Sequence, residues 1–511
     1  MRLLTLWAMF VIAGFLLTGC VGEDEKPSVG GDDSASGDCT TKLADNITAA
    51  SAGSTVALDA CTYREKVIIN KSITLVGQEG SKITGTDVWT NWSGRVSTNT
   101  VPTFVTDTEC EPGTSECSRP EQVFFDGKYL TQVASSPASG QFALDSARHV
   151  VLGDDPAGHT VEVTVRDGWV LGAASDVTID NVDMIGSANS RSGERSGALD
   201  NNGYPNWTVK NSDLSYGHAA VVALWGNTGL TLQDNVIHHG GQLGVGSYRA
   251  TLNLLNNTIH TNNIADYFHD WEAGGVKATY HEQSQWSGNE VYANNGYAFW
   301  CDITCNGVEI SNNRMHHNAG SAIYYEISSN GNIHHNTIWE NGWKYNDGAW
   351  TGSGIHTTNC WGCDVYNNTV AWNQNGISVL HTTSTEQFET ANNWIHDNYI
   401  YMKDYPSFLP FYSCSRQLAL GYCGEADPSN RGSGNKYYYP TVESSAPRYH
   451  YNTSGHSSLA SFNATPGDEG GTYMTTAQKD ANLSALGVPN RPSFRFGSHL
   501  KSVGKLLRGL F

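Results

Sequence analysis

Two acidic residues lie in segments that otherwise read as apolar strands. Asp302 falls in "YAFWCDI" and Glu326 in "AIYYEIS". Two carboxylates that lie close together repel each other, which raises the pKa of one and keeps it protonated near neutral pH. Such a pair could divide the work of a displacement reaction: one group attacks as a carboxylate and the other donates a proton.

Whether the two residues meet depends on a repeat in the middle of the chain. Segments such as "NNTIHTN", "NNRMHHN" and "HNTIWEN" recur, and one Asn in each serves as a marker. The shorter intervals between markers are roughly 22–24 residues, which fits a stack of short strands and turns, and the longer intervals indicate inserted loops. The markers are Asn235, Asn257, Asn289, Asn313, Asn336, Asn368 and Asn398.

Each unit reads as a period-2 strand entered through its marker Asn, which we expect in the left-handed conformation of a tight bend. The apolar residue two places later should point inward and stack on its equivalents, because no coil can bury that face alone. The sequence therefore predicts an all-β chain that folds as a right-handed parallel β-helix. A β-sandwich is the alternative, but it would not show Asn in register. The predicted inward residues are Ile237, Ile259, Val291, Met315, Ile338, Val370 and Ile400.

The markers also act as a ruler for the two carboxylates. Asp302 follows Asn289 at the same distance along the chain as Glu326 follows Asn313, so the two acids hold equivalent places in adjacent coils. Neighbouring parallel strands are about 4.8 Å apart, so equivalent carboxyl groups should be about 5 Å apart. Retaining glycosidases hold their two carboxyl groups about 5–5.5 Å apart, and inverting enzymes about 6.5–9.5 Å. A solvated charge ladder is the alternative, but like charges on neighbouring strands destabilise each other.

The coil before Asp302 supplies further candidates for substrate contacts. Lys277 falls near the Asp302 column, either as a substrate contact or as a structural partner that neutralises the carboxylate. A long marker interval places an insertion beside the same face, whose residues could rim a pocket: His269, Asp270, Trp271 and Glu272. Three tryptophans could stack on sugar rings, although packing in the core or a loop is an equal alternative for each: Trp271, Trp286 and Trp300.

The cysteines and histidines favour structural roles. Without Cys20, ten cysteines remain, in close pairs that predict five local disulfides in an exported protein. The pairs are Cys39–Cys61, Cys110–Cys117, Cys301–Cys305, Cys360–Cys363 and Cys414–Cys423. The fourth pair could instead be a redox or zinc motif, but no second such motif accompanies it. One histidine follows the marker by three places in several coils, which favours a ladder over a metal site: His238, His260 and His316. We predict no cofactor, although calcium could support the fold or bridge a substrate.

The N-terminus indicates export. Residues 1–20 read as a secretory signal, and its end, "LTGC", resembles a bacterial lipobox. This resemblance implies cleavage before Cys20, lipidation of that residue and a place at the bacterial cell envelope; an uncleaved membrane anchor is the alternative. Residues 21–38 read as a flexible tether, 39–460 as the β-helix domain, and 461–511 as a capping segment with a basic tail. A net charge of −20 argues against nucleic acid as a partner, and we expect a monomer that meets the membrane only through its lipid.

The segments "WEAGGVK", "FWCDITCNG" and "AIYYEIS" together are similar to the parallel β-helix β-xylosidases and related β-helix glycoside hydrolases. The resemblance implies that Asp302 is the nucleophile, Glu326 the acid/base and Glu272 a sugar-binding residue. It covers only the part of the chain from Trp271 to Ser328. The chain departs from the group in its lipobox, its cysteine pairs and its expected lack of the additional β-sandwich found in some members, so the sugar specificity is open.

Two other functions remain open from the sequence. A polysaccharide lyase could use Lys277 as the base, but lyases of this fold usually surround the site with positive charge. From His260 to Tyr345 the basic residues are only Lys277, Arg314 and Lys344, among many acidic ones. A carbohydrate-binding surface protein without catalysis is the other alternative.

Overall fold

The computed structural model describes residues 37–191, 196–345, 352–382, 389–403, 418–423, 427–442 and 447–492. The described residues belong to one compact unit. The predicted signal, Cys20 and most of the tether lie outside the described residues, as does the basic tail from residue 493. None of the described helices is long and apolar enough to cross a membrane.

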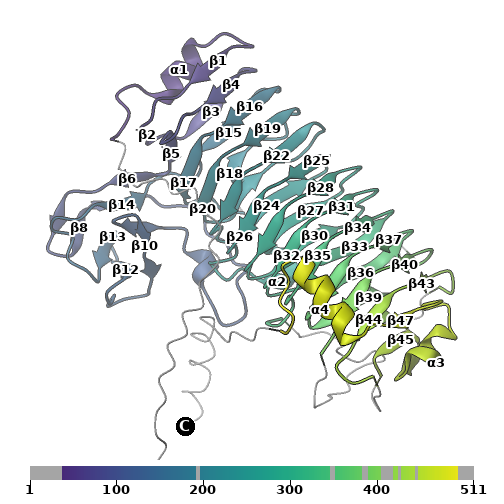
Figure 1. Ribbon diagram of the computed structural model, residues 1–511. Helices are drawn as coiled ribbons and strands as arrows, with labels where there is room; N and C mark the ends of the chain where they lie inside the picture. The colour runs from purple at the N-terminus through teal and green to yellow at the C-terminus, as the bar shows by residue number, and fades with distance from the viewer. Residues whose placement is uncertain are drawn as a thin grey trace, which may run out of the picture. The chain divides into compact units, whose positions relative to one another are not determined.

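The chain winds through three long, parallel sheets, one strand of each sheet per coil (Figure 1). The prediction of a right-handed parallel β-helix is confirmed. We call the sheets 1, 2 and 3 in the order in which each coil visits them.

Sheet 1 contains β1 (Thr55–Ala57), β4 (Thr74–Val76), β16 (Val177–Asp180), β19 (Trp207–Lys210), β22 (Leu230–Gln233), β25 (Leu252–Leu255), β28 (Gln285–Ser287), β31 (Glu309–Ser311), β34 (Asn332–His334), β37 (Asp364–Tyr366), β40 (Trp394–His396) and β43 (Arg431–Ser433). Sheet 2 contains β2 (Thr62–Tyr63), β5 (Lys82–Thr84), β17 (Asp183–Ser187), β20 (Asp213–Gly217), β23 (Val236–His238), β26 (Thr258–His260), β29 (Glu290–Tyr292), β32 (Arg314–His316), β35 (Thr337–Trp339), β38 (Thr369–Ala371), β41 (Tyr399–Tyr401), β44 (Lys436–Tyr438) and β47 (Thr472–Tyr473).

Sheet 3 carries the candidate site and contains β3 (Val67–Ile69), β15 (Val170–Gly172), β18 (Gly197–Asp200), β21 (Ala220–Ala223), β24 (Leu243–Tyr248), β27 (Gly274–Thr279), β30 (Tyr297–Asp302), β33 (Ile323–Ser329), β36 (Ser353–Trp361), β39 (Asn375–Leu380), β42 (Leu420–Cys423), β45 (Tyr449–Asn452) and β46 (Ser454–His456). The last of these pairs antiparallel with β45, while the strands before it pair parallel.

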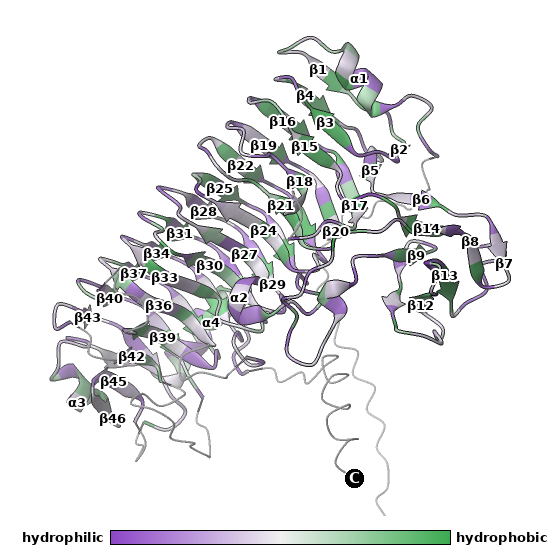
Figure 2. Cartoon of the chain, turned by 180° about the vertical axis from the view of Figure 1, so that it is seen from behind, coloured by the Kyte–Doolittle hydropathy of each residue, from purple (hydrophilic) through white to green (hydrophobic). Residues whose placement is uncertain are grey.

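The core is the column of inward side chains between the three sheets. The seven predicted inward residues are all fully buried. Hydrophobic residues recur along the strands from coil to coil (Figure 2). At the start of the solenoid, α1 (Leu43–Ala49) adds Leu43 and Ile47 to this core, and at its end α3 (Leu459–Asn463) adds Leu459 and Phe462. These two helices cover coil ends that would otherwise expose apolar surface.

The marker asparagines are buried and form a ladder of amides. Asn289 donates from its backbone N–H and its Nδ2 to Asn313 Oδ1, both at 2.9 Å, and Asn313 repeats this pattern with Asn336. The expectation that the marker itself takes the left-handed conformation is wrong. The residue before it does so, as at Asn312 (φ 57°), while the marker satisfies the polar groups of the bend from inside.

The histidine column is part of an aromatic ladder on sheet 2. His260 stacks on His238 at 5.0 Å between ring centroids and on Tyr292 at 4.8 Å, and Tyr292 stacks on His316 at 5.0 Å. Among the described residues, no group of three or more His, Cys, Asp or Glu side chains could hold a metal ion.

Residues 86–164 form an inserted lobe between β5 and β15. One of its sheets contains β6 (Thr86–Val88), β9 (Val123–Phe125), β10 (Lys128–Tyr129) and β14 (Val161–Thr164); the other contains β7 (Trp92–Ser93), β8 (Val96–Thr100), β11 (Thr131–Gln132), β12 (Gln141–Leu144) and β13 (His149–Leu152). Both sheets contribute to one small apolar core, which includes Val123, Phe142 and Val161. The expected absence of an inserted β-sandwich is therefore wrong.

Residues after 460 remain part of the solenoid in two ways. Strand β47 pairs with β44 at the end of sheet 2. Helix α4 (Thr476–Ala485), which begins with a capping box at Thr475 and Gln478, places Leu483 in an apolar cluster with Trp372 and Tyr401 on the outer side of sheet 2.

Candidate active site

The two carboxylates occupy equivalent places on adjacent strands of sheet 3. Strands β30 and β33 pair in register up to Cys301 and Tyr325, and the next residue of each strand is Asp302 or Glu326. Cys301 and Tyr325 face the core, so the following side chains face outward. Since neighbouring parallel strands are about 4.8 Å apart, we expect the two carboxyl groups to be about 5 Å apart.

Lys277 is two residues out of the predicted column. It pairs with Trp300, while Thr279 pairs with Asp302. Because side chains alternate along a strand, Lys277 still lies on the same outward face as Asp302. The difference arises because the segment from Thr279 to the next marker, Asn289, is one residue shorter than the equivalent segment from Asp302 to Asn313.

Asp302 and Lys277 form a buried ion pair; each residue is only 7% exposed. The ammonium lies 3.1 Å from Asp302 Oδ2, donates to the carbonyl of Trp271 at 2.8 Å and sits 3.4 Å above the ring centroid of Trp300. Asp302 Oδ1 is buried and has no hydrogen-bond partner among the described residues. Oδ2 of Asp302 is therefore held by the ammonium, whereas Oδ1 accepts no hydrogen bond from the described residues.

Glu326 is placed to exchange a proton near neutral pH. Burial and then the negative charge of Asp302 raise the pKa of Glu326 to about 7, while Tyr324, Lys277 and Trp300 act in the opposite direction. The Trp300 indole N–H donates to Glu326 Oε2 at 3.2 Å. The two carboxyl groups thus have different surroundings: one is held by an ammonium, and the other meets a crowded, apolar wall.

That wall consists of Trp300, Tyr324 and His356, which share the outward row of Lys277, and of Tyr297, which lies earlier in β30. Tyr324 stacks on Trp300 at 5.3 Å and on His356 at 4.7 Å, and Tyr297 lies edge-on to Trp300 at 4.8 Å. Sequence reasoning missed Tyr297, Tyr324 and His356 as site residues. The count from the marker asparagines that aligned Glu326 could also have identified Tyr324, because Tyr324 lies two residues before Glu326 in the same strand.

Helix α2 (His269–Glu272) is the predicted insertion beside the site, but its side chains have different roles. Asp270 accepts a hydrogen bond from the Tyr297 hydroxyl at 3.1 Å, which links it to the aromatic wall. Glu272 forms an ion pair with Arg191, whose guanidinium lies 3.8 Å from the ring centroid of Trp271. The backbone carbonyl of Trp271 accepts a hydrogen bond from the Lys277 ammonium.

The inserted lobe reaches this insertion through Glu111. Its carboxylate lies 2.5 Å from His269 Nδ1, and the ring of this buried histidine stacks on Tyr345 at 3.5 Å between centroids. Sequence reasoning missed Glu111, because nothing in its local sequence connects it with a residue 158 positions away.

Among the other predicted tryptophans, Trp286 is fully buried in the core and cannot meet a sugar. Trp300 is almost as buried, but it lies between Lys277 and Tyr324 and donates a hydrogen bond to Glu326. In the protein without substrate, the Trp300 ring therefore packs against Tyr324 and the Lys277 ammonium, and its N–H holds Glu326.

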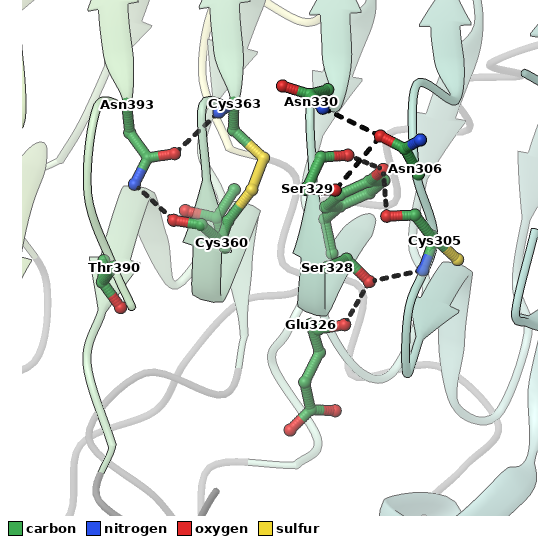
Figure 3. The surroundings of a disulfide bond; sticks show 12 residues. Cys305, Asn306, Glu326, Ser328, Ser329, Asn330, Cys360, Cys363, Thr390 and Asn393 are labelled. Atoms are coloured by element: carbon green, nitrogen blue, oxygen red, sulfur yellow. Dashed lines mark hydrogen bonds between the residues drawn. A yellow bond between two sulfur atoms is a disulfide. The ribbon is translucent and has the colours of Figure 1, made fainter. Parts of the chain in front are cut away.

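The predicted Cys301–Cys305 disulfide brackets Asp302 along the chain, with an S–S distance of 2.03 Å. The Ser328 hydroxyl donates to the carbonyl of Glu326 and accepts from the Cys305 N–H at 3.0 Å, so the turn after Asp302 is tied to the strand of Glu326. Figure 3 shows this link and the Glu326 side chain pointing away from it.

Three more predicted pairs are disulfides: Cys39–Cys61, Cys110–Cys117 and Cys360–Cys363. The last of these closes a loop next to the Asn393 amide, a structural role for this motif (Figure 3). Cys414 lies outside the described residues, so its pairing with Cys423 stays a prediction.

Replacing Lys277 with methionine should lower the free energy of unfolding by about 3–5 kcal/mol, because it leaves the Asp302 charge buried without its ammonium partner. Chemical denaturation at pH 7 measures this loss. The double variant with Asp302→Asn removes both charges and should recover a large part of it.

The Lys210–Asp180 pair offers a matched control, since its N–O distance is also 3.1 Å but both side chains are much more exposed. Lys210→Met should cost at most about 1 kcal/mol. Equal losses for Lys277→Met and Lys210→Met would contradict a buried, mutually dependent pair.

Fold and site together define the class of protein: a right-handed parallel β-helix with a carboxylate pair on the outer face of one sheet. In agreement, the family profile for a right-handed β-helix region matches residues 197–361. A search of curated proteins finds no match.

The chain is similar in structure to several β-helix proteins. It matches XylC, solved in complex with xylose, with a TM-score of 0.54 and 13% identity over 78% of this chain and 72% of XylC. It also matches the catalytic unit of an α-1,3-glucanase from Streptomyces thermodiastaticus (TM-score 0.38, 12% identity, 70% and 83% covered). A third match is PfbA, a surface adhesin of Streptococcus pneumoniae (TM-score 0.41, 12% identity, 82% and 91% covered). At 13% identity, the similarity to XylC shows a common fold.

Proposed function

We propose that the protein is a retaining glycoside hydrolase that acts on an oligo- or polysaccharide by double displacement. The observation that carries the proposal is the pairing of Asp302, held by Lys277, with Glu326, whose pKa is raised to about 7, on equivalent positions of adjacent coils. The similarity of the surrounding segments to the β-helix β-xylosidases supports the same roles.

In the first step, a carboxylate oxygen of Asp302 attacks the anomeric carbon. The glycosidic bond breaks, and Glu326 gives its proton to the departing oxygen. The products of this step are a glycosyl ester on Asp302, a shortened or released alcohol and an ionised Glu326.

In the second step, the ionised Glu326 takes a proton from water as the water attacks the glycosyl ester. Asp302 leaves as a carboxylate, and Glu326 is protonated again. Two inversions at one carbon give a product with the anomeric configuration of the substrate. Lys277 stabilises Asp302 as a carboxylate at the start and end of the cycle, when its charge is largest.

Lys277 suits this role better than that of a lyase base. A base must offer an unprotonated amine, whereas the contacts of Lys277 are those of an ammonium: a carboxylate, a carbonyl and an aromatic face. Substrate contacts from Asp270, Trp271 and Glu272 remain part of the proposal, with His269 holding the insertion to the lobe.

We further propose that the enzyme is exported and anchored by a lipid at Cys20. The disulfides suit an oxidising compartment, and radiolabelled palmitate incorporated into wild type but not into Cys20→Ala would test the anchor.

Release of reducing sugar from a panel of glycans tests the activity, with wild type and Asp302→Ala assayed side by side. We expect release by wild type only. Product that absorbs near 235 nm, roughly where an unsaturated uronate absorbs, would favour a lyase, and tight binding of a glycan without turnover would favour a binding protein.

A further inference from the structure

Next to the catalytic pair, on its N-terminal side, Tyr248, Arg249 and Tyr280 form a cluster at the ends of β24 and β27, in which Tyr248 and Arg249 are exposed and Tyr280 is half-buried. We infer that this cluster, here called the flanking cluster, binds further rings of the glycan, so that the substrate is an extended chain lying along the solenoid axis. This inference rests on the proposed function and names its substrate class.

The register of the sheet places the cluster in line with the carboxylates. Tyr248 pairs with Thr279, and Thr279 pairs with Asp302, so the three are equivalent residues of successive coils. Tyr248 is therefore about 10 Å from Asp302 along the axis. Ser247 and Ala278, the residues before Tyr248 and Thr279, are buried, which fixes the outward direction of Tyr248.

Two outward residues beside the cluster have small side chains or none. Thr279 separates Tyr248 from Asp302, and the neighbouring outward row has Gly246 where the next coil has Lys277. A Cβ on Gly246 would meet its nearest neighbours only at 3.7 Å, so the bare backbone there is not required by packing. Small residues in this place leave the sheet face open beside two tyrosines.

The cluster offers the groups that a sugar ring needs. Tyr248 is 41% exposed, and its ring lies 5.4 Å from Tyr280. The Arg249 guanidinium lies 5.0 Å from the Tyr248 ring centroid and 5.4 Å from that of Tyr280. The structure records no carboxylate partner for Arg249 within the described residues, so its donors are available for hydroxyl or carboxylate oxygens. Aromatic faces pack on the apolar faces of a ring while such donors hold its polar edge.

The spacing of the coils also indicates which kind of glycan fits this face. Equivalent outward residues follow a straight line with one step per coil, of about 4.8 Å. A β-1,4-linked chain of pyranoses is a straight ribbon whose rings advance by a similar step, whereas many α-linked chains curl away from a line. The cluster therefore suits a β-1,4-linked glycan, with the ring cleaved at Asp302 and others over Thr279 and Tyr248.

Chain-length dependence tests the inference with two short and two long probes: the dinitrophenyl β-xyloside and β-glucoside, and xylohexaose and cellohexaose. We expect Tyr248→Ala and Arg249→Ala to lower kcat/KM on the better hexaose about tenfold, as for a lost aromatic contact. The aryl glycosides carry no ring far enough to reach the cluster and should be cleaved at the wild-type rate.

Trp394→Ala is a matched control. Trp394 is an exposed aromatic that lies 5.0 Å from an arginine guanidinium, but it belongs to sheet 1. The Trp394→Ala variant should cleave the aryl glycosides and the hexaoses with the kcat/KM of wild type. Equal losses on short and long substrates, or no loss on the hexaose, would overturn the inference.

Binding measurements distinguish failure of the proposed hydrolase function from failure of the inference about the flanking cluster. If wild type cleaves none of the probes, calorimetry with the two hexaoses still measures the cluster: binding that Tyr248→Ala weakens tenfold supports a glycan site without hydrolysis. Binding of neither hexaose to wild type or to Asp302→Asn overturns the cluster as a β-1,4-glycan site.

Discussion

Asp302→Asn should lower kcat by at least about a thousandfold while leaving substrate binding nearly intact, because the amide cannot form the glycosyl ester that carries the reaction. Asparagine keeps the size of the side chain but no longer neutralises Lys277. Turnover is measured as reducing-sugar release on the glycan that wild type cleaves, and calorimetry measures binding.

Chemical rescue distinguishes loss of a nucleophile from loss of structure. In Asp302→Ala, azide can enter the space left by the carboxylate and displace the leaving group in one step. The expected product is a glycosyl azide of inverted configuration. Glu309→Ala, which removes an exposed carboxylate from sheet 1, should keep wild-type activity and should not respond to azide. Wild-type turnover by Asp302→Ala, with normal folding, would end the assignment of a nucleophile.

Glu326→Gln should lower kcat/KM by about 10²–10⁴-fold on natural glycans, the range of a lost general acid. Substrates with good leaving groups need little protonation, so the loss on dinitrophenyl glycosides should be much smaller in the glycosylation step. The same loss on both kinds of substrate would contradict an acid/base role.

The pH dependence follows from the raised pKa of Glu326. Wild-type kcat/KM should fall as pH rises through about 7, because the protonated acid is lost there. In Glu326→Gln this alkaline limb should disappear. A limb that persists unchanged in the variant would assign it to another group.

The raised pKa of Glu326 should also make the free energy of unfolding depend on pH, and the direction of this dependence can be derived. The folded pKa of Glu326 is above the ordinary value of 4.5, so between those values the folded state binds more protons than the unfolded state. Stability therefore falls as pH rises through this window. Relative to wild type, Glu326→Gln should gain about 1–3 kcal/mol in unfolding free energy between pH 5 and pH 8. Denaturation curves of both proteins at the two pH values measure this gain.

The repeating part of the molecule could be predicted from the sequence because one physical requirement recurs in every coil. Each bend needs buried amides, and each strand needs an inward apolar residue, so Asn313 and Met315 report the same geometry as Asn336 and Ile338. Once the coil length is known, equivalent positions follow by counting. Asp302 and Glu326 could be aligned in this way. Four disulfides could be predicted separately, from the close spacing of their cysteines.

Features outside the repeat could not be predicted by counting. The lobe of residues 86–164 has short strands without a period, and its contact between Glu111 and His269 joins distant parts of the chain. The register of Lys277 is two positions from the Asp302 column because the segment between β27 and the next marker differs in length from its equivalent in the following coil. Trp286 could not be assigned to the core from its type alone, since exposed and buried tryptophans look alike in sequence.

The stereochemistry of the first product tests the central claim most directly. Proton NMR, recorded within the first minutes after adding enzyme to the glycan that it cleaves, shows the anomeric configuration of the new reducing end before mutarotation. Carboxylates about 5 Å apart on adjacent coils predict retention of the substrate's configuration. A product of inverted configuration, or an unsaturated product without a new hemiacetal of retained configuration, would contradict double displacement at Asp302 and Glu326.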